Sequence, residues 1–190
     1  MTKLFFYDTE TTGLPLFKEP SEHPDQPHIV QVAAALVDVD TRKIISSINL
    51  IIKPDGYEIP PEMTDIHGID TAYASAYGVP LVVAMSAFFH LWDGLKRVAF
   101  NESFDARIIR IAQHKLGHAE KQLDEWKVSE KECAMKMAHK YTNLPRNKWP
   151  KLQEAHRHFF GSDFDNVHNA MADVEATIKV YFAVKDLEAV

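Results

Sequence analysis

The stretch FYDTETTG, residues 6–13, ends a short apolar run abruptly at a carboxylate. Side chains two residues apart on a β-strand point to the same face of the sheet. If the strand that begins at Lys3 continues past Tyr7, then Asp8 and Glu10 lie side by side at its carboxyl end. Two carboxylates at that separation repel each other, so their ionised forms need a positive partner. The sequence therefore predicts a site for a cationic group at this strand end.

Length and composition are those of an ordinary globular domain. The chain has 190 residues, of which 46% are hydrophobic and 25% charged, and we expect a single domain over residues 1–190. The longest apolar runs, such as 79–85, are too short to span a bilayer. Asp8 and Glu10 interrupt the apolar segment that a signal peptide would need. The single cysteine, Cys133, favours a reducing compartment, and we expect a cytoplasmic protein without membrane partners.

Hydrophobic periodicity predicts strands first, and then strands that alternate with helices. The expected strands are 3–7, 29–39, 44–53 and 97–100, with a hairpin turn at the polar residues 40–43. The expected helices are 60–67, 70–77, 81–95, 103–117, 152–160 and 169–187. Residues 133–141 are expected to pass from a strand end into a helix, whereas 118–131 favour no element. This order indicates one α/β domain with a mixed sheet and helices on both faces.

Two later acidic residues are placed to join Asp8 and Glu10. Asp105 follows a predicted strand and falls in the first turn of a helix, where the helix dipole also favours a carboxylate. Asp173 lies in an alanine-rich, otherwise apolar helix that is able to pack closely against a sheet. We therefore interpret Asp173 as a ligand, while Asp105 fits either a ligand or a helix-capping role.

The spacing between His168 and Asp173 restricts where the histidine lies. Five residues along an α-helix correspond to about 500° of rotation, about 140° net, so the two side chains do not share a face of one helix. If both serve one site, His168 must lie in the turn before the helix. A packing or N-capping histidine remains the alternative on spacing alone.

Carboxylates that converge at strand ends suit hard divalent cations. Oxygen ligands favour Mg²⁺ or Mn²⁺ over zinc, and the chain has no cysteine cluster for a soft metal. Two such ions about 4 Å apart are able to stabilise the attacking and leaving oxygens of a phosphodiester displacement. A neutral histidine beside them is able to take the proton of the attacking water. The residues thus predict two-metal phosphodiester hydrolysis.

Three motifs resemble, in order and spacing, those of the DEDDh family of 3′–5′ exonucleases. They are Asp-x-Glu-Thr-Thr-Gly at 8–13, Asn-x-x-Phe-Asp at 101–105 and His-x-Ala-x-x-Asp at 168–173. Residues 66–69 and 133–135 also look like the family, so the resemblance covers nearly the whole chain. The family includes proofreading subunits of bacterial replicative polymerases and RNA-trimming enzymes. The resemblance implies a ribonuclease H-like fold with a five-stranded mixed sheet.

The resemblance also implies a role for each matching residue. The four motif acids would bind two Mg²⁺ or Mn²⁺ ions, with Asp8 bridging both and Asp105 acting largely through water. These metal-binding acids are Asp8, Glu10, Asp105 and Asp173. His168 would be the general base. The implied substrate contacts are Thr9, Thr11, Gly13, His67 and Asn101.

Two segments lie outside the motifs. Residues 136–158 hold six basic residues against one acidic residue, Glu154, in a chain of net charge −6. This segment fits a solvated surface or a basic rim beside an acidic centre, where Trp149 is the better candidate for stacking on a base. We interpret the proline-rich loop 14–27 as a surface excursion, with a flap near the substrate as the alternative.

The sequence therefore predicts a divalent-metal-dependent 3′–5′ exonuclease. It would act on 3′ ends of single-stranded or frayed nucleic acid, DNA being favoured, and release nucleoside 5′-monophosphates. The alternatives are an RNA-trimming exoribonuclease of the same family, an inactivated relative that acts as a binding module, and a metal-dependent phosphatase or phosphodiesterase for small molecules. A stand-alone trimming or repair enzyme is favoured over a proofreading subunit of a polymerase complex.

Overall fold

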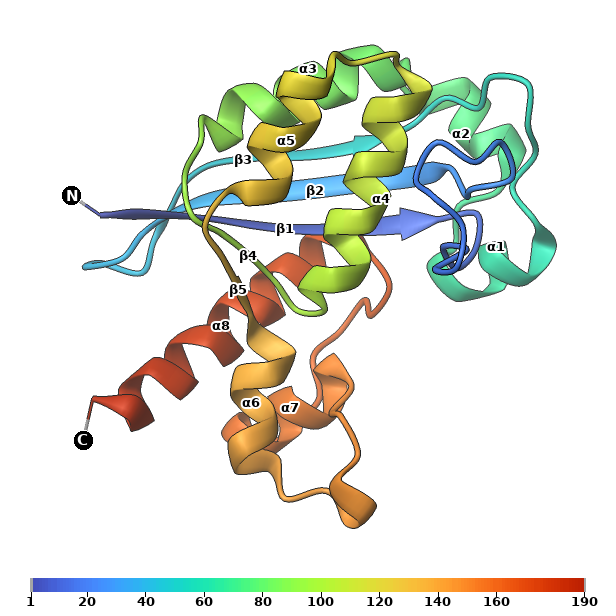
Figure 1. Cartoon of the computed structure of the whole chain (residues 1–190). Coiled ribbons are helices and arrows are strands. Elements are labelled where there is room, and N and C mark those ends of the chain that lie inside the picture. The colour runs from blue at the N-terminus through green and yellow to red at the C-terminus, as the bar shows by residue number, and fades with distance from the viewer. Residues whose placement is uncertain (1, 190) are drawn as a thin grey trace.

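The computed structural model describes residues 2–189 and places a five-stranded mixed sheet at the centre of the fold (Figure 1). The strands are β1 (Lys3–Thr11), β2 (Ile29–Asp38), β3 (Ile44–Ile51), β4 (Arg97–Ala99) and β5 (Lys131–Cys133). Their spatial order is β3-β2-β1-β4-β5. β2 pairs antiparallel with both β1 and β3, whereas β4 pairs parallel with β1 and β5. The predicted hairpin and mixed α/β architecture are therefore confirmed.

Helices cover both faces of this sheet (Figure 1). They are α1 (Pro61–His67), α2 (Thr71–Tyr77), α3 (Leu81–Trp92), α4 (Glu102–Lys115), α5 (Glu120–Val128), α6 (Ala134–Thr142), α7 (Leu152–Phe160) and α8 (Ala170–Glu188), with a short 3-10 helix η1 (Pro145–Asn147). One core contains side chains of α3, α4 and α5, and a second contains side chains of α6, α7 and α8. Within residues 2–189, no helix is both long and apolar enough to cross a membrane.

Strand β1 lies between the two cores and contributes alternate side chains to each. Phe5 and Tyr7 pack in the core of α3–α5, whereas Leu4 and Phe6 pack in the core of α8. The strand continues past its apolar run to Thr11, because residues 8–11 still pair with β2. Asp8 and Glu10 therefore extend the row of side chains that faces α8.

Small residues allow α8 to approach that face closely. Ala33 and Ala35 of β2 are fully buried in the same core as Ala170 and Val174 of α8. A larger side chain at the two strand positions would hold the helix further from the sheet, since protein interiors are close-packed. The alanine-rich pattern around Asp173 thus brings this acid to the sheet, as the sequence predicts.

Helix α5 was not predicted, because its sequence shows no apolar periodicity. Residues 118–131 are polar, and α5 is anchored by one large side chain, that of Trp126, which is fully buried. The Trp126 indole donates a hydrogen bond to the Ala106 carbonyl on α4 at 3.2 Å. A single aromatic anchor leaves no repeating signal in the sequence.

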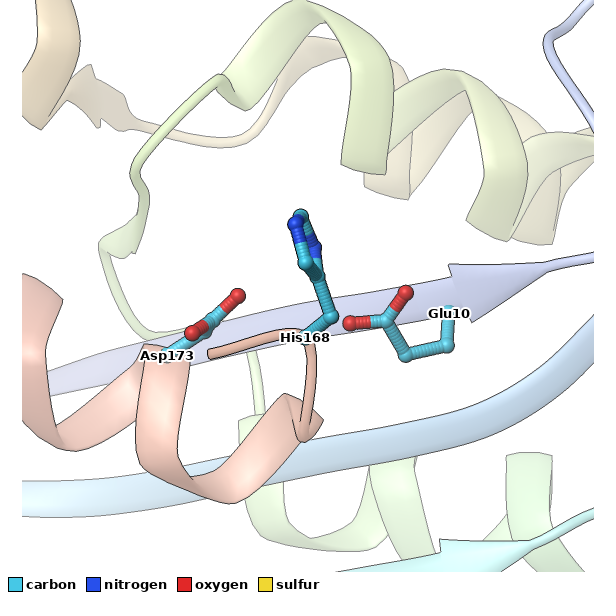
Figure 2. Close-up of side chains that lie close together, drawn as sticks. All are labelled: Glu10, His168 and Asp173. Carbon is cyan, nitrogen blue, oxygen red and sulfur yellow. The ribbon is translucent and has the colours of Figure 1, made fainter. Parts of the chain in front are cut away.

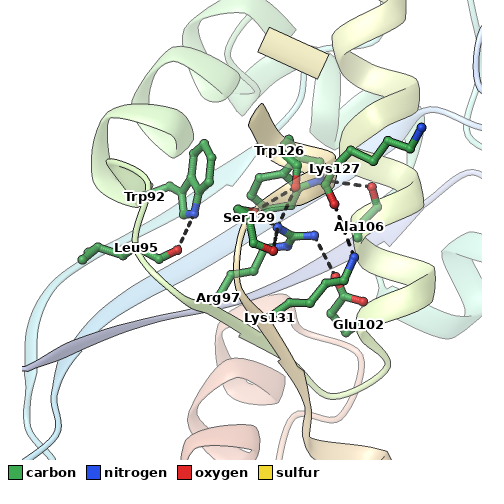
Figure 3. A network of polar contacts seen from close by, with 9 residues as sticks. All are labelled: Trp92, Leu95, Arg97, Glu102, Ala106, Trp126, Lys127, Ser129 and Lys131. Atoms are coloured by element: carbon green, nitrogen blue, oxygen red, sulfur yellow. Dashed lines mark hydrogen bonds and ion pairs between the residues drawn. The ribbon is translucent and has the colours of Figure 1, made fainter. Parts of the chain in front are cut away.

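A buried arginine on β4 links this strand to helices α4 and α5 (Figure 3). Arg97 of β4 is fully buried and donates hydrogen bonds to the Trp126 carbonyl at 2.7 Å and to Glu102 Oε1 at 3.0 Å. It also donates to Ser129 Oγ, and its guanidinium carbon lies 4.1 Å from the centroid of the Trp126 ring. Because Glu102 is the first residue of α4, this ion pair fixes the start of the helix that carries Asp105.

We expect Arg97→Met to lower the free energy of unfolding by about 3–5 kcal/mol, since it leaves Glu102 buried without a cationic partner. Urea unfolding followed by circular dichroism measures the loss. Adding Glu102→Gln should recover part of it by removing the unpaired charge. The control is Arg42→Met, which breaks an ion pair with Asp186 between half-exposed side chains and should cost only about 0–1 kcal/mol. Equal losses for the two methionine variants would contradict the prediction.

Candidate active site

Acidic side chains from three elements converge at the carboxyl end of β1. Asp8 and Glu10 come from β1, Asp105 from the first turn of α4 and Asp173 from the first turn of α8. Burial raises the pKa of Asp8, and the charges of the other three acids raise it further. Among residues 2–189, none of the four forms an ion pair with a lysine or arginine. The predicted acidic cluster exists, and residues 2–189 provide it with no lysine or arginine ion pair.

Asp105 is held at the strand end by Thr9. The Thr9 backbone N–H and hydroxyl both donate to Asp105 Oδ1, at 3.1 and 2.8 Å. Both residues are buried, so these two bonds connect α4 to β1 in the protein interior. Burial raises the pKa of Asp105 to about 7, although the bonds from Thr9 favour the ionised form. Asp105 is thus a ligand candidate, and Thr9 orients it.

Glu10, His168 and Asp173 form the tightest group of the site. One ligand atom from each lies within 4.8 Å of the others. Figure 2 shows the imidazole between the two carboxylates, with His168 rising from the turn before α8. The two acids are only 8% exposed, whereas His168 is exposed. The arrangement places a proton acceptor at the open side of a buried acidic pair.

The conformation of His168 confirms its predicted place in the turn before α8. Its φ of +64° lies in the left-handed region, which costs a residue with a β-carbon about 1–3 kcal/mol. The following residue, Asn169, caps α8 by accepting hydrogen bonds from the N–H groups of Met171 and Ala172. Burial and the charge of Lys151 lower the pKa of His168. A neutral imidazole at physiological pH is able to accept a proton.

The donor set fits divalent cations. Burial, together with the charges of Asp173 and Asp105, raises the pKa of Glu10 to about 8, and burial raises that of Asp173 to about 7. Asp173 Oδ1 is buried and has no hydrogen-bond partner. Buried carboxylates in this state are stabilised by a bound cation, and carboxylate oxygens are the ligands that Mg²⁺ and Mn²⁺ prefer.

Three of the residues predicted to contact substrate lie at the ends of structural elements: Thr11 ends β1, His67 ends α1 and Asn101 precedes α4. Thr11 is buried, and its hydroxyl donates to the Gly13 carbonyl at 2.7 Å, which orders the backbone after β1. His67, at the end of α1, has a buried Nε2 without a hydrogen-bond partner. Burial lowers the pKa of His67, and the charge of the neighbouring His168 lowers it further. Asn101 precedes α4 and accepts a hydrogen bond from the Ser103 hydroxyl at 3.0 Å.

In the basic segment 136–158, Lys151 is the residue whose charge lowers the pKa of His168, and the sequence alone does not single it out. Lys151 lies at the start of α7, and its charge acts on His168. Three other basic side chains of the segment are paired with acids: Lys140 with Glu188, Lys148 with Glu154, and Arg157 with Asp163. Trp149 is half-exposed, with its ring centroid 4.3 Å from that of His139. The segment therefore presents less free positive charge than its composition indicates.

Loop 14–27 is ordered around one buried side chain. Gln26 accepts a hydrogen bond from the Leu16 N–H at 3.0 Å and donates to the carbonyls of Leu16 and Pro20 at 3.1 and 2.8 Å. Arg107 of α4 also donates to the Glu19 carbonyl. These contacts hold the loop against α4, while Phe17 remains exposed.

The raised pKa values predict how pH changes the stability of the metal-free protein. Between about pH 4 and pH 8 the folded state holds protons on these acids that the unfolded chain releases. This contribution to stability is complete below pH 4 and is lost as the pH rises to 8. We expect Asp173→Asn to raise the melting temperature in EDTA at pH 8 by at least about 2–4 °C, the effect of 1 kcal/mol at this size, and to change it little at pH 4.5.

Thermal unfolding followed by circular dichroism measures the effect. Asp163→Asn, which alters an exposed acid paired with Arg157, is the matched control and should give no increase. A wild-type protein equally stable at both pH values, with no gain from Asp173→Asn, would contradict the raised pKa values of these acids.

Comparisons with known proteins give the family and the fold. Residues 5–181 match the family model described as Exonuclease. No curated protein matches the chain significantly. The crystal structure of E. coli exonuclease I in complex with a dT13 oligonucleotide aligns with a TM-score of 0.77 at 24% identity, covering 97% of this chain and 41% of that chain. The zinc-bound E. coli ExoI–ssDNA complex gives 0.79 at 23% identity, covering 100% and 42%.

A third solved structure, described as an ExoI/SSB-Ct complex, aligns with a TM-score of 0.75 at 22% identity, covering 98% of this chain and 41% of that chain. The chain thus spans about two fifths of the length of these solved chains. The alignments confirm the ribonuclease H-like fold that the motifs imply. Since the family model covers nearly the whole sequence, this chain belongs to the exonuclease family, with the DEDDh set of motif residues.

Proposed function

We propose that this chain is a divalent-metal-dependent 3′–5′ exonuclease that acts on single-stranded or frayed nucleic acid, with DNA the favoured substrate. The observation that carries the proposal is the convergence of four acids without a counter-charge and one exposed histidine at the end of β1. Membership of the exonuclease family supports nuclease chemistry. The solved E. coli exonuclease I complex with a dT13 oligonucleotide favours single-stranded DNA as the substrate.

In the proposed reaction, each residue of the cluster has a separate task. Asp8, Glu10, Asp105 and Asp173 would hold Mg²⁺ or Mn²⁺, which when bound would polarise the phosphodiester and lower the pKa of a bound water. His168 accepts a proton from the attacking water on a neutral ring nitrogen. The water oxygen bonds to phosphorus as the bond to the 3′-oxygen of the preceding nucleotide breaks. The product is a nucleoside 5′-monophosphate.

In this proposal the residues around the acids contact the substrate. The backbone of residues 9–13 and the side chains of His67 and Asn101 approach the terminal nucleotide. Lys151, whose charge lowers the pKa of His168, approaches a phosphate. Trp149 is half-exposed and able to stack on a base.

The wider setting is also part of the proposal. We assign residues 1–190 to a single catalytic domain, since the family match extends from residue 5 to residue 181. The single cysteine, a free thiol, supports a cytoplasmic location. The ExoI/SSB-Ct complex shows a similar protein bound to SSB-Ct, which supports association of this chain with a partner of that kind. A role in DNA repair is favoured over proofreading within a polymerase.

The test is degradation of 5′-labelled single-stranded DNA and matched RNA with Mg²⁺ and then Mn²⁺. We expect DNA with a free 3′-hydroxyl to shorten stepwise and release 5′-monophosphates, and a 3′-phosphate to slow the reaction strongly. Asp8→Asn should abolish turnover while the metal-free variant remains folded. Cleavage of circular DNA, release of 3′-monophosphates, or full activity of Asp8→Asn would contradict the proposal. Faster degradation of RNA would assign the site to RNA trimming.

The role of His168 gives a separate prediction. His168→Ala should lower the single-turnover rate at saturating Mg²⁺ by roughly 10²- to 10⁴-fold, the usual contribution of a general base. Calorimetric titration with Mn²⁺ should show binding close to wild type. His90→Ala, which alters an exposed histidine of α3, is the control and should leave the rate unchanged. A His168→Ala rate within a few-fold of wild type would make this residue structural.

A further inference from the structure

Gln31 interrupts an apolar row on the face of β2 that α8 covers. Ala33, Ala35 and Val37 of this row are fully buried in the core of α8. Gln31 continues the row and is only 3% exposed. It lies directly opposite Glu10 in the pairing of β1 with β2. Buried glutamine side chains require hydrogen-bond partners, and those of Gln31 lead to the active site.

The two ends of the Gln31 amide bind different elements. Its Nε2 donates to Asn49 Oδ1 on β3 at 2.8 Å. Its Oε1 accepts a hydrogen bond from the backbone N–H of Ala170, the first residue of α8, at 3.1 Å. One neutral side chain therefore joins two strands of the sheet to the start of α8. The partners 31 and 170 are 139 residues apart in the chain.

This bond completes the hydrogen bonding at the start of α8. The first N–H groups of a helix have no partner within it. Asn169 accepts from Met171 and Ala172 with its side chain, and from Asp173 with its carbonyl. The remaining N–H group of this turn, that of Ala170, donates to Gln31 Oε1. The contact lies two residues after His168 and three before Asp173.

We infer that Gln31 is a positioning residue for the proposed exonuclease reaction. It fixes the first turn of α8 against β2, so that His168 and Asp173 face Glu10 within the 4.8 Å group. The Asn49 contact holds the Gln31 amide in the orientation that presents Oε1 to Ala170. The inference rests on the proposed function, since it concerns the geometry of that site.

The amide suits this position for an electrostatic reason. It donates and accepts at once and adds no charge, whereas an ionised acid would place a fifth carboxylate beside Glu10. An apolar side chain of equal volume would preserve the packing but leave the Ala170 N–H buried without a partner. Gln31→Met is therefore the variant that removes the contact with the least change in volume.

The test compares Gln31→Met and Gln31→Glu with the wild type on 5′-labelled single-stranded DNA at saturating Mg²⁺. We expect Gln31→Met to lower kcat by roughly 10- to 100-fold, the usual effect of losing a group that orients a ligand, with KM within about threefold. Gln31→Glu should give a kcat between those of Gln31→Met and the wild type, because its carboxylate oxygen still accepts from Ala170 but adds a negative charge beside Glu10. The control is Gln113→Met, which alters a fully buried glutamine of α4 that donates to the Gln122 carbonyl; it should leave kcat unchanged.

Amide hydrogen exchange of the metal-free proteins is a readout independent of activity. The Ala170 amide should exchange faster in Gln31→Met than in the wild type or Gln31→Glu. A kcat of Gln31→Met within twofold of wild type, an equal fall in Gln113→Met, or an unchanged Ala170 exchange rate would overturn the inference. If Gln31→Met does not fold, failure of folded Asn49→Ala to increase Ala170 exchange would overturn it. An inactive wild-type protein would instead contradict the proposed function, leaving the exchange experiment to test the contact.

Discussion

Holding four carboxylates together in a largely buried site is the constraint on which the rest of this structure depends. Burial raises the pKa of all four acids, and at Asp8 and Glu10 the charges of neighbouring acids raise it further, so the fold holds these groups where their ionised forms are disfavoured. Burial of apolar side chains in the two cores on either side of β1 offsets this cost. Phe5 and Tyr7 pack in one core, and Phe6 packs in the other. Because one strand is buried on both faces, its end is a rigid support for groups that would otherwise move apart.

The two acids that come from helices, Asp105 and Asp173, are held in place by polar contacts of those helices with the sheet. Thr9 orients Asp105, the Arg97–Glu102 ion pair fixes the start of α4, and Gln31 holds the start of α8. These contacts join separate elements in the protein interior, where a hydrogen bond or ion pair is strong and its loss is costly. The left-handed turn at His168 persists because the surrounding contacts determine the position of α8.

The sequence predicts the parts of this structure that have local signals. The acids of β1 follow an apolar run, the β2–β3 hairpin follows from alternation and a polar turn, and the spacing of His168 and Asp173 places the histidine before the helix. Helix α5 was not predicted, because it packs on the core mainly through Trp126 and therefore has no apolar periodicity. Gln31 and Lys151 also carry no signal as site residues, since their relation to His168 and Asp173 arises only when β2, α7 and α8 come together.

The charge distribution of this acidic chain is compatible with the polyanionic substrate of the proposed function. Most of the negative charge near the reaction centre belongs to buried acids that a pair of divalent cations would neutralise, so the metal-loaded centre no longer repels phosphate. Three basic side chains of the segment 136–158 form ion pairs with Glu154, Asp163 and Glu188, which reduces its free positive charge. Lys151, by contrast, acts on His168, because its charge lowers the pKa of that histidine. In the proposed function this positive charge would attract the reacting end of the substrate, which suits the removal of terminal nucleotides one at a time.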